Sequence, residues 1–95
     1  MVRRIVEASS PQRIVLFGSY ARNEADPESD VDLLILFPDL VDRHEMTLRL
    51  YSRLVGSTLP KDMVIATSEE FDRYKEVTNC IFWVAARQGR VIYEA

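Results

Sequence analysis

Residues 13–37 read RIVLFGSYARNEADPESDVDLLILF, two apolar runs separated by a polar segment. The first run, residues 13–17, is rich in β-branched and aromatic side chains and stops at Gly18, which is typical of a buried strand. The second run, residues 30–37, alternates at first and then becomes continuously apolar, which predicts a strand covered on both faces towards its end. The sequence therefore predicts two strands joined by the polar residues 20–29.

Two aspartates, Asp30 and Asp32, open the second predicted strand. Residues two apart on a strand point to the same face, with Cα atoms roughly 6 to 7 Å apart, so we expect the two carboxylates to converge. Carboxylates and substrate phosphates are the ligands that hard cations such as Mg²⁺ take, and two ions about 3.5 to 4 Å apart can share such a pair. The pattern indicates a metal-dependent site.

Gly18 and Ser19 follow directly after the first predicted strand. Glycine lets the backbone turn sharply and approach a phosphate, and the serine hydroxyl and free N–H groups at the start of a following helix can donate to it. Ser19 could also serve as the N-cap of that helix, and the two roles are compatible. A Gly-Ser pair alone is weak evidence, and an isolated Asp-x-Asp is usually a solvated strand end. Their combination at this interval favours a nucleotide site.

With these motifs in place, the sequence resembles the nucleotidyltransferases related to DNA polymerase β. Their signature is a hydrophobic strand, Gly-Ser, a short interval and Asp-x-Asp on the next strand. Residues 15–22, VLFGSYAR, and residues 29–34, SDVDLL, carry this resemblance. It is closest to the minimal nucleotidyltransferases and covers essentially the whole chain. The resemblance implies a nucleotidyltransferase fold and magnesium-dependent transfer of a nucleotide.

The resemblance also implies roles for individual residues. Asp30 and Asp32 would hold catalytic magnesium, two ions in all, while Gly18 and Ser19 would hold the triphosphate of ATP. Arg22, in the same segment, either contacts a phosphate or is a solvated residue.

A third carboxylate is expected from a later strand in this family, as a metal ligand or as the group that activates the attacking hydroxyl. Asp62 matches that place, although Asp72 and Asp39 are alternatives. The sequence departs from the family at Asn23, where relatives often have glycine. Asparagine tolerates a left-handed conformation better than most residues, so we expect the turn to survive.

The function expected from the resemblance is transfer of AMP from ATP to a hydroxyl acceptor, with release of pyrophosphate. Relatives of this size are typically antitoxins of a helical HEPN-class toxin, so the resemblance implies such a partner, with a tyrosine of the toxin as the acceptor. The principal alternative is a non-catalytic module that binds nucleotide and neutralises its partner by occlusion. A structural subunit and a transferase for small molecules are further alternatives.

The remaining pattern predicts a small mixed sheet flanked by helices, of the α/β or α+β class, in a single domain over residues 1–95. The expected helices are residues 1–9, 41–54, 69–74 and 79–87, and the further strands are residues 62–66 and 91–93.

Composition narrows the possible partners. The net charge is −3 and the basic residues are scattered, which argues against an extended nucleic-acid surface. No apolar run is long enough to span a membrane and no signal peptide is visible, so we expect a cytoplasmic protein. Because 95 residues leave little room for an acceptor site, a partner or a second copy would have to supply surface, and oligomers are possible. The lone Cys80 is expected to be a small buried residue, and His44 a surface residue.

Overall fold

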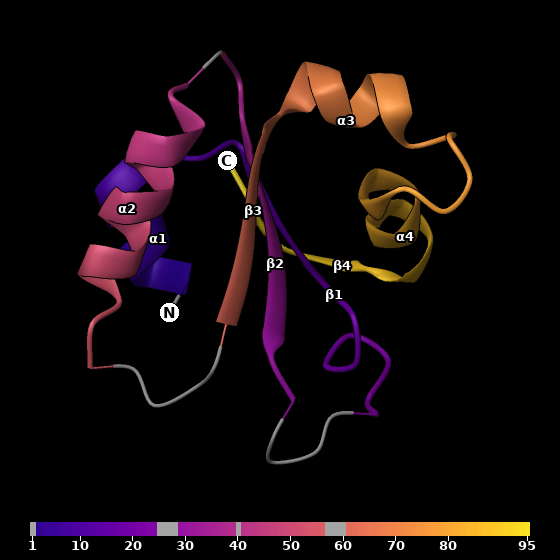
Figure 1. The fold of residues 1–95 in the computed structure, drawn as a ribbon, viewed down its shortest axis with the longest axis horizontal. Coiled ribbons are helices and arrows are strands. Elements are labelled where there is room, and N and C mark those ends of the chain that lie inside the picture. Colours follow the sequence, from indigo (N-terminus) through magenta and orange to yellow (C-terminus); the bar gives the residue numbers. More distant parts are fainter. Residues whose placement is uncertain (1, 25–28, 40, 57–60) are drawn as a thin grey trace.

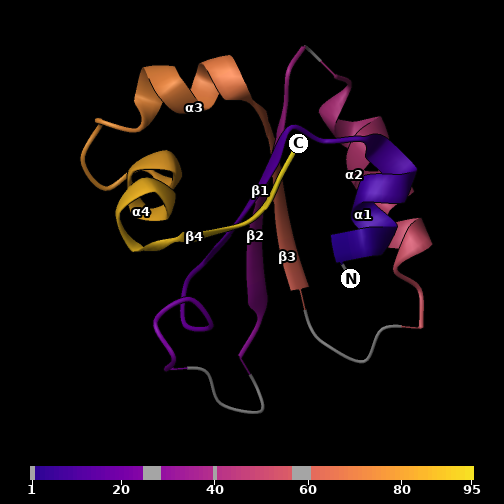
Figure 2. The same ribbon diagram turned by 180° about the vertical axis from the view of Figure 1, so that it is seen from behind.

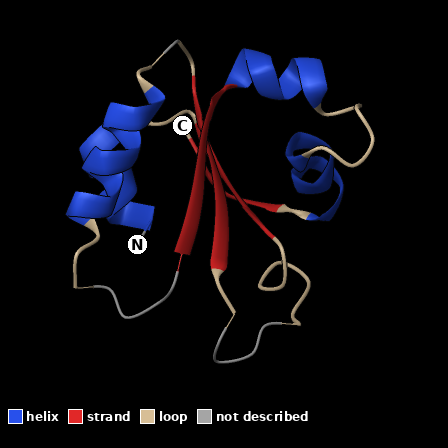
Figure 3. Cartoon of the chain, viewed as in Figure 1, coloured by secondary structure: helices blue, strands red, loops and turns tan. Residues whose placement is uncertain are grey.

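The computed structural model describes residues 2–24, 29–39, 41–56 and 61–95. These residues form a sheet with strand order β3-β2-β1-β4 and helices on both of its faces, as Figures 1 and 3 show. The elements, in chain order, are α1 (Val2–Ser9), β1 (Arg13–Phe17), β2 (Val31–Phe37), α2 (Arg43–Arg53), β3 (Lys61–Thr67), α3 (Ser68–Tyr74), α4 (Ile81–Gln88) and β4 (Arg90–Glu94).

The sheet is mixed, as the sequence predicts. β1 runs antiparallel to both β2 and β4, whereas β2 and β3 are parallel. Two parallel neighbours need a crossover connection, and α2 supplies it between β2 and β3. As a result the end of β1 and the beginnings of β2 and β3 lie at one edge of the sheet, which is the lower edge in Figure 1.

Helices α1 and α2 cover one face of the sheet, and α3 and α4 cover the other (Figures 1 and 2). Side chains of successive strand residues point to opposite faces, so each central strand contributes to two cores. The core on the α1 and α2 side contains Ile5, Ile14, Leu33, Ile35 and Leu50, among others. The core on the α3 and α4 side contains Val15, Leu34, Leu36, Phe71 and Ala85, among others. This two-sided burial explains why β2 is almost continuously apolar.

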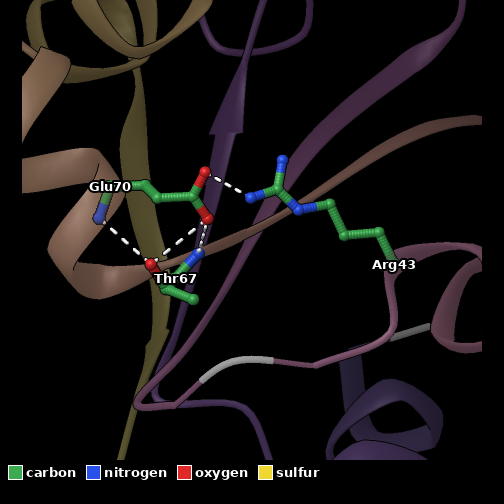
Figure 4. A network of polar contacts seen from close by, with 3 residues as sticks. All are labelled: Arg43, Thr67 and Glu70. Carbon is green, nitrogen blue, oxygen red and sulfur yellow. Dashed lines mark hydrogen bonds and ion pairs between the residues drawn. The ribbon is translucent and has the colours of Figure 1, made fainter.

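Polar contacts hold the two helical layers together at the upper edge of the sheet. Thr67 caps α3, because its side chain accepts the Glu70 N–H while the Glu70 carboxylate accepts the Thr67 N–H, a reciprocal capping box. Arg43, the first residue of α2, also donates to Glu70 (Figure 4). This network therefore ties α2 on one face of the sheet to α3 on the other.

The sequence-based elements match the structure with small differences at their ends. α2 begins at Arg43 and not at Val41, because the Asp42 side chain accepts the Glu45 N–H and so marks the start of the helix. His44 is exposed, as predicted. The prediction that Cys80 is buried was wrong: its side chain is half-buried, and its thiol donates to the carbonyl of Tyr74.

Within the described ranges, no helix is long and apolar enough to cross a membrane.

Candidate functional site

The predicted site residues lie at the edge where β1 ends and β2 and β3 begin. The strand register aligns Phe17 of β1 with Asp32 of β2, and Asp32 with Asp62 of β3. Directly paired residues on neighbouring strands point to the same face, and the strands are roughly 4.8 Å apart. Asp32 and Asp62, 30 positions apart in the sequence, are therefore direct neighbours on the α3 and α4 face.

The two residues of the Asp-x-Asp motif differ in their surroundings. Asp32 is the second residue of β2 and is half-buried, whereas Asp30 lies one residue before the strand and is exposed. Asp62 is also exposed. The prediction that Asp30 belongs to the strand was therefore one residue too long.

Burial and neighbouring negative charge both act on Asp32. Desolvation raises the pKa of its carboxyl, and the carboxylates of Asp62 and Asp30 raise it further, while the Arg22 guanidinium lowers it. Asp30 and Asp62 are thus close enough to disfavour the charge on Asp32. An acidic group whose charge is disfavoured in this way gains most from a nearby cation.

The three carboxylates have the chemistry of a magnesium site, since Mg²⁺ prefers oxygen ligands and accepts substrate phosphates beside one or two carboxylates. In the part of the chain that the structure describes, however, no three His, Cys, Asp or Glu side chains are grouped closely enough to hold one ion together. Magnesium sites of this kind are completed by the phosphates of the substrate.

The alternatives for the third carboxylate lie elsewhere. Asp39 follows the far end of β2, and Asp72 belongs to α3, which starts where β3 ends. In Figure 1 the end of β2 and helix α3 lie at the top, whereas β2 begins at the bottom, so both alternatives are away from Asp32. Asp72 is paired with Lys75. The strand register thus favours Asp62.

Gly18 provides the close approach between the end of β1 and the acidic residues. Its φ is +75°, in the region that favours glycine, and a Cβ placed on it would lie 2.2 Å from Oδ2 of Asp32. Any larger residue would displace this carboxylate. Gly18 is therefore required both by backbone conformation and by space.

The segment after Gly18 is a series of tight turns and not the helix that was considered from the sequence. The N–H groups of Ala21 and Arg22 donate to the Gly18 carbonyl, and the N–H of Glu24 donates to the carbonyl of Ser19. Asn23 has φ +58°, which confirms that it adopts the left-handed conformation. Ser19 consequently does not cap an α-helix.

The turns leave backbone donors beside the carboxylates. Within residues 2–24 and the other described ranges, the N–H groups of Ser19 and Tyr20 donate to no backbone carbonyl. Successive free N–H groups in a turn form a concave anion site. This arrangement suits a phosphate next to the acidic residues without a helix N-terminus.

Arg22 is exposed and contacts Glu24 and Gln88. Its Nε donates to Oε2 of Glu24 at 3.1 Å, and its Nη1 donates to Oε1 of Gln88 at 3.2 Å. Sequence reasoning missed Gln88, because the last residue of α4 carries no signal that would relate it to a turn 66 positions earlier. Arg22 itself is placed near Asp32, as its effect on the pKa of Asp32 indicates.

Comparison with known proteins gives a family match. The model of a family described as nucleotidyltransferase domain matches residues 1–88. A proposed protein adenylyltransferase of Methanocaldococcus jannaschii is 61% identical over 28 residues, which are 30% of this chain and 28% of that protein. The matched stretch thus spans less than a third of this relative.

Solved structures share the fold. A proposed nucleotidyltransferase from Sulfolobus solfataricus has a TM-score of 0.66 at 18% identity, with 98% of this chain and 73% of that chain covered. A toxin–antitoxin structure with AMP-PNP has a TM-score of 0.60 at 22% identity, with 99% and 70% covered. A mutant of the toxin–antitoxin MntA-HpeT has a TM-score of 0.59 at 19% identity, again with 99% and 70% covered. At these identities the likeness establishes the fold.

Proposed function

The chain belongs to the nucleotidyltransferase domain family, and we propose that it transfers AMP from ATP to a hydroxyl acceptor and releases pyrophosphate. The observation that carries this proposal is the alignment of Asp32 with Asp62 beside the turn at Gly18 and Ser19. It places negatively charged side chains and free backbone donors at one edge of the sheet. The family match confirms the prediction from the sequence that the protein is a nucleotidyltransferase.

The residues divide into two groups in this reaction. The N–H groups of Ser19 and Tyr20 bind phosphate oxygens, and Gly18 lets the Asp32 carboxylate lie against the same turn. Asp30, Asp32 and Asp62 would hold magnesium. When bound, magnesium neutralises charge on the triphosphate and lowers the pKa of the acceptor hydroxyl.

The transfer itself exchanges one phosphoester bond for another. The acceptor oxygen forms a bond to the α-phosphorus, and the bond from that phosphorus to the bridging oxygen of the β-phosphate breaks. Asp62 is exposed and sits at the rim of the site, so it can take the proton of the hydroxyl as the bond forms. Asp32, half-buried between the other two carboxylates, is the more suitable permanent ligand.

We further propose that the acceptor is a hydroxyl on a partner protein and that the partner is a helical toxin of the HEPN class. The name of the Methanocaldococcus jannaschii relative supports protein as the acceptor class. The two toxin–antitoxin structures with the same fold support a toxin as the partner, and the AMP-PNP in one of them supports an adenine nucleotide. Asp62 and Asp30 are exposed, so a large acceptor can reach them.

We also propose that residues 1–95 work as one domain in the cytoplasm. The single domain is supported by the two hydrophobic cores, because both are built on strands of the same sheet.

The decisive experiment is transfer of label from ATP labelled at the α-phosphate, with magnesium, into the protein encoded by the neighbouring gene. We expect label with the wild type and a loss of roughly 100-fold or more with Asp32→Asn, as for other groups that stabilise developing charge. Asp72→Asn is the matched control, because Asp72 is an exposed aspartate distant from the site. It should label the partner as well as the wild type does.

Two other results would change the conclusion. If wild type and Asp32→Asn label the partner equally, the site is not at Asp32. If neither labels it and both silence it, the chain is a binding module that acts by occlusion.

A further inference from the structure

The guanidinium of Arg22 is held from two sides by residues of different charge. Glu24, an anion, accepts from Nε at 3.1 Å, and Gln88, a neutral amide, accepts from Nη1 at 3.2 Å. Arg22 is therefore oriented before any ligand arrives, and one of its donors is already occupied by a carboxylate.

Gln88 reaches Arg22 because α4 ends very close to β1. A Cβ on Gly89 would lie 2.4 Å from the carbonyl oxygen of Ala85 and 3.0 Å from that of Leu16. Only glycine permits this approach. Since Leu16 is two residues before Gly18, the end of α4 is fixed beside the turn that carries Arg22.

The Nε edge of an arginine is one of the two edges that bind planar or tetrahedral anions with two parallel hydrogen bonds. In this structure the carboxylate of Glu24 lies at that edge. A phosphate that uses both donors of the edge must replace Glu24. Gln88 carries no charge, so its contact with Nη1 orients the guanidinium without competing for it as an anion does.

We propose that Gln88 and Glu24 set the affinity of Arg22 for a nucleotide phosphate: Gln88 is a positioning residue that holds the guanidinium at the site, and Glu24 is an anionic placeholder that the phosphate displaces. The inference rests on the proposed function, in which Arg22 contacts the triphosphate. It adds two residues to the site, with opposite effects on binding.

The test is the dissociation constant of AMP-PNP with magnesium, measured by calorimetry for single and double variants of the full chain. Gln88→Ala should raise the Kd roughly three- to ten-fold, as for loss of one hydrogen bond. Glu24→Gln should lower the Kd by about two- to five-fold, as for removal of an exposed ion pair. Both effects should disappear when Arg22→Ala is already present, because each acts through Arg22.

A matched control separates a specific effect of Glu24 from a change in net charge. Glu7 accepts from Nε of Arg3 at 3.1 Å, an exposed pair on α1 with the same Nε–oxygen distance as that between Arg22 and Glu24. Glu7→Gln should leave the Kd unchanged. All of these variants alter exposed residues, so thermal unfolding should show them folded.

The outcomes distinguish the inference from the function on which it rests. If Arg22→Ala alone leaves the Kd unchanged, Arg22 does not bind the nucleotide, and the phosphate contact in the proposed function is wrong. If Arg22→Ala weakens binding but the other effects persist in its background, Gln88 and Glu24 act independently of Arg22 and the inference is overturned. The inference is also overturned if neither Gln88→Ala nor Glu24→Gln changes the Kd in otherwise wild-type protein.

Discussion

Gly18 and Asp32 are packed so closely that a Cβ on Gly18 would lie 2.2 Å from a carboxylate oxygen of Asp32. The two halves of the sequence motif are therefore in direct contact. β1 and β2 are antiparallel neighbours, and this brings the end of one strand against the start of the next. A glycine at position 18 is thus needed both for the turn and for the position of the Asp32 carboxylate.

Gly18→Ala should lose both stability and nucleotide binding. A residue with a Cβ at φ +75° costs about 1–2 kcal/mol, and the contact with Asp32 adds to it. Gly56→Ala is a matched control, because Gly56 has φ +96° but nothing within 4 Å of its Cβ position. Urea unfolding should show a loss for both variants, whereas AMP-PNP binding should be lost only in Gly18→Ala. Equal nucleotide binding by the two variants would show that the contact with Asp32 has no role.

Asp32→Asn should make the protein more stable at pH 7 in the absence of divalent cations, even though we expect the same variant to lose transfer. The pKa of Asp32 is raised above its ordinary value of 3.8 in the folded state by burial and by Asp62 and Asp30. The folded state therefore binds a proton at Asp32 more tightly than the unfolded state. As the pH rises above 3.8 and Asp32 ionises, its charge lowers the stability of the fold. Asparagine removes that cost.

Thermal unfolding as a function of pH checks this prediction. The advantage of Asp32→Asn should be largest near neutral pH and should vanish below about pH 3.8, where Asp32 is protonated in both states. Magnesium should raise the melting temperature of the wild type and not that of the variant, since only the wild type keeps the Asp32 carboxylate that would bind the ion. Asp72→Asn should show no advantage. A variant less stable than wild type at pH 7 would contradict the argument.

Glu70→Gln should weaken the contact between the two helical layers. Burial alone would raise the pKa of Glu70, but hydrogen bonds from Thr67 and Arg43 together with the charge of Arg43 lower it below 4.5. A depressed carboxyl pKa stabilises the fold above the unfolded value and loses this contribution as the pH falls through the folded value. Glutamine can keep the hydrogen bond of the capping box, so the substitution removes the charge-assisted contact with Arg43 and the negative charge in the first turn of α3, and we expect a loss of about 0.5–1 kcal/mol at pH 7.

Urea unfolding of Glu70→Gln and Glu69→Gln provides the comparison. Glu69 is the neighbouring residue and forms an exposed pair with Arg73, so its loss should cost well under about 1 kcal/mol. The difference between Glu70→Gln and wild type should shrink when the pH is lowered below the folded pKa of Glu70. An equal cost for the two variants would show that the charge of Glu70 contributes no more than that of a surface ion pair.

Local signals predicted most of the elements. β1 was predicted with its observed ends, because a β-branched run bounded by glycine has few alternatives. Thr67 was one of two predicted starts of α3, since Thr67 and Glu70 have the spacing of a capping box. The helix considered after Ser19 did not form, because a left-handed Asn23 closes the segment into turns.

By itself, the sequence determined the Gly-Ser and Asp-x-Asp motif and the mixed sheet with flanking helices, because both follow from residue order and apolar periodicity. It also named Asp62, with Asp39 and Asp72 left as alternatives. Only the tertiary structure favoured Asp62, since the parallel register of β2 and β3 places it beside Asp32. The contact of Gln88 with Arg22 likewise depends on packing, where the missing side chain of Gly89 brings the end of α4 against β1. Such contacts join distant positions through space, and no local pattern of residues records them.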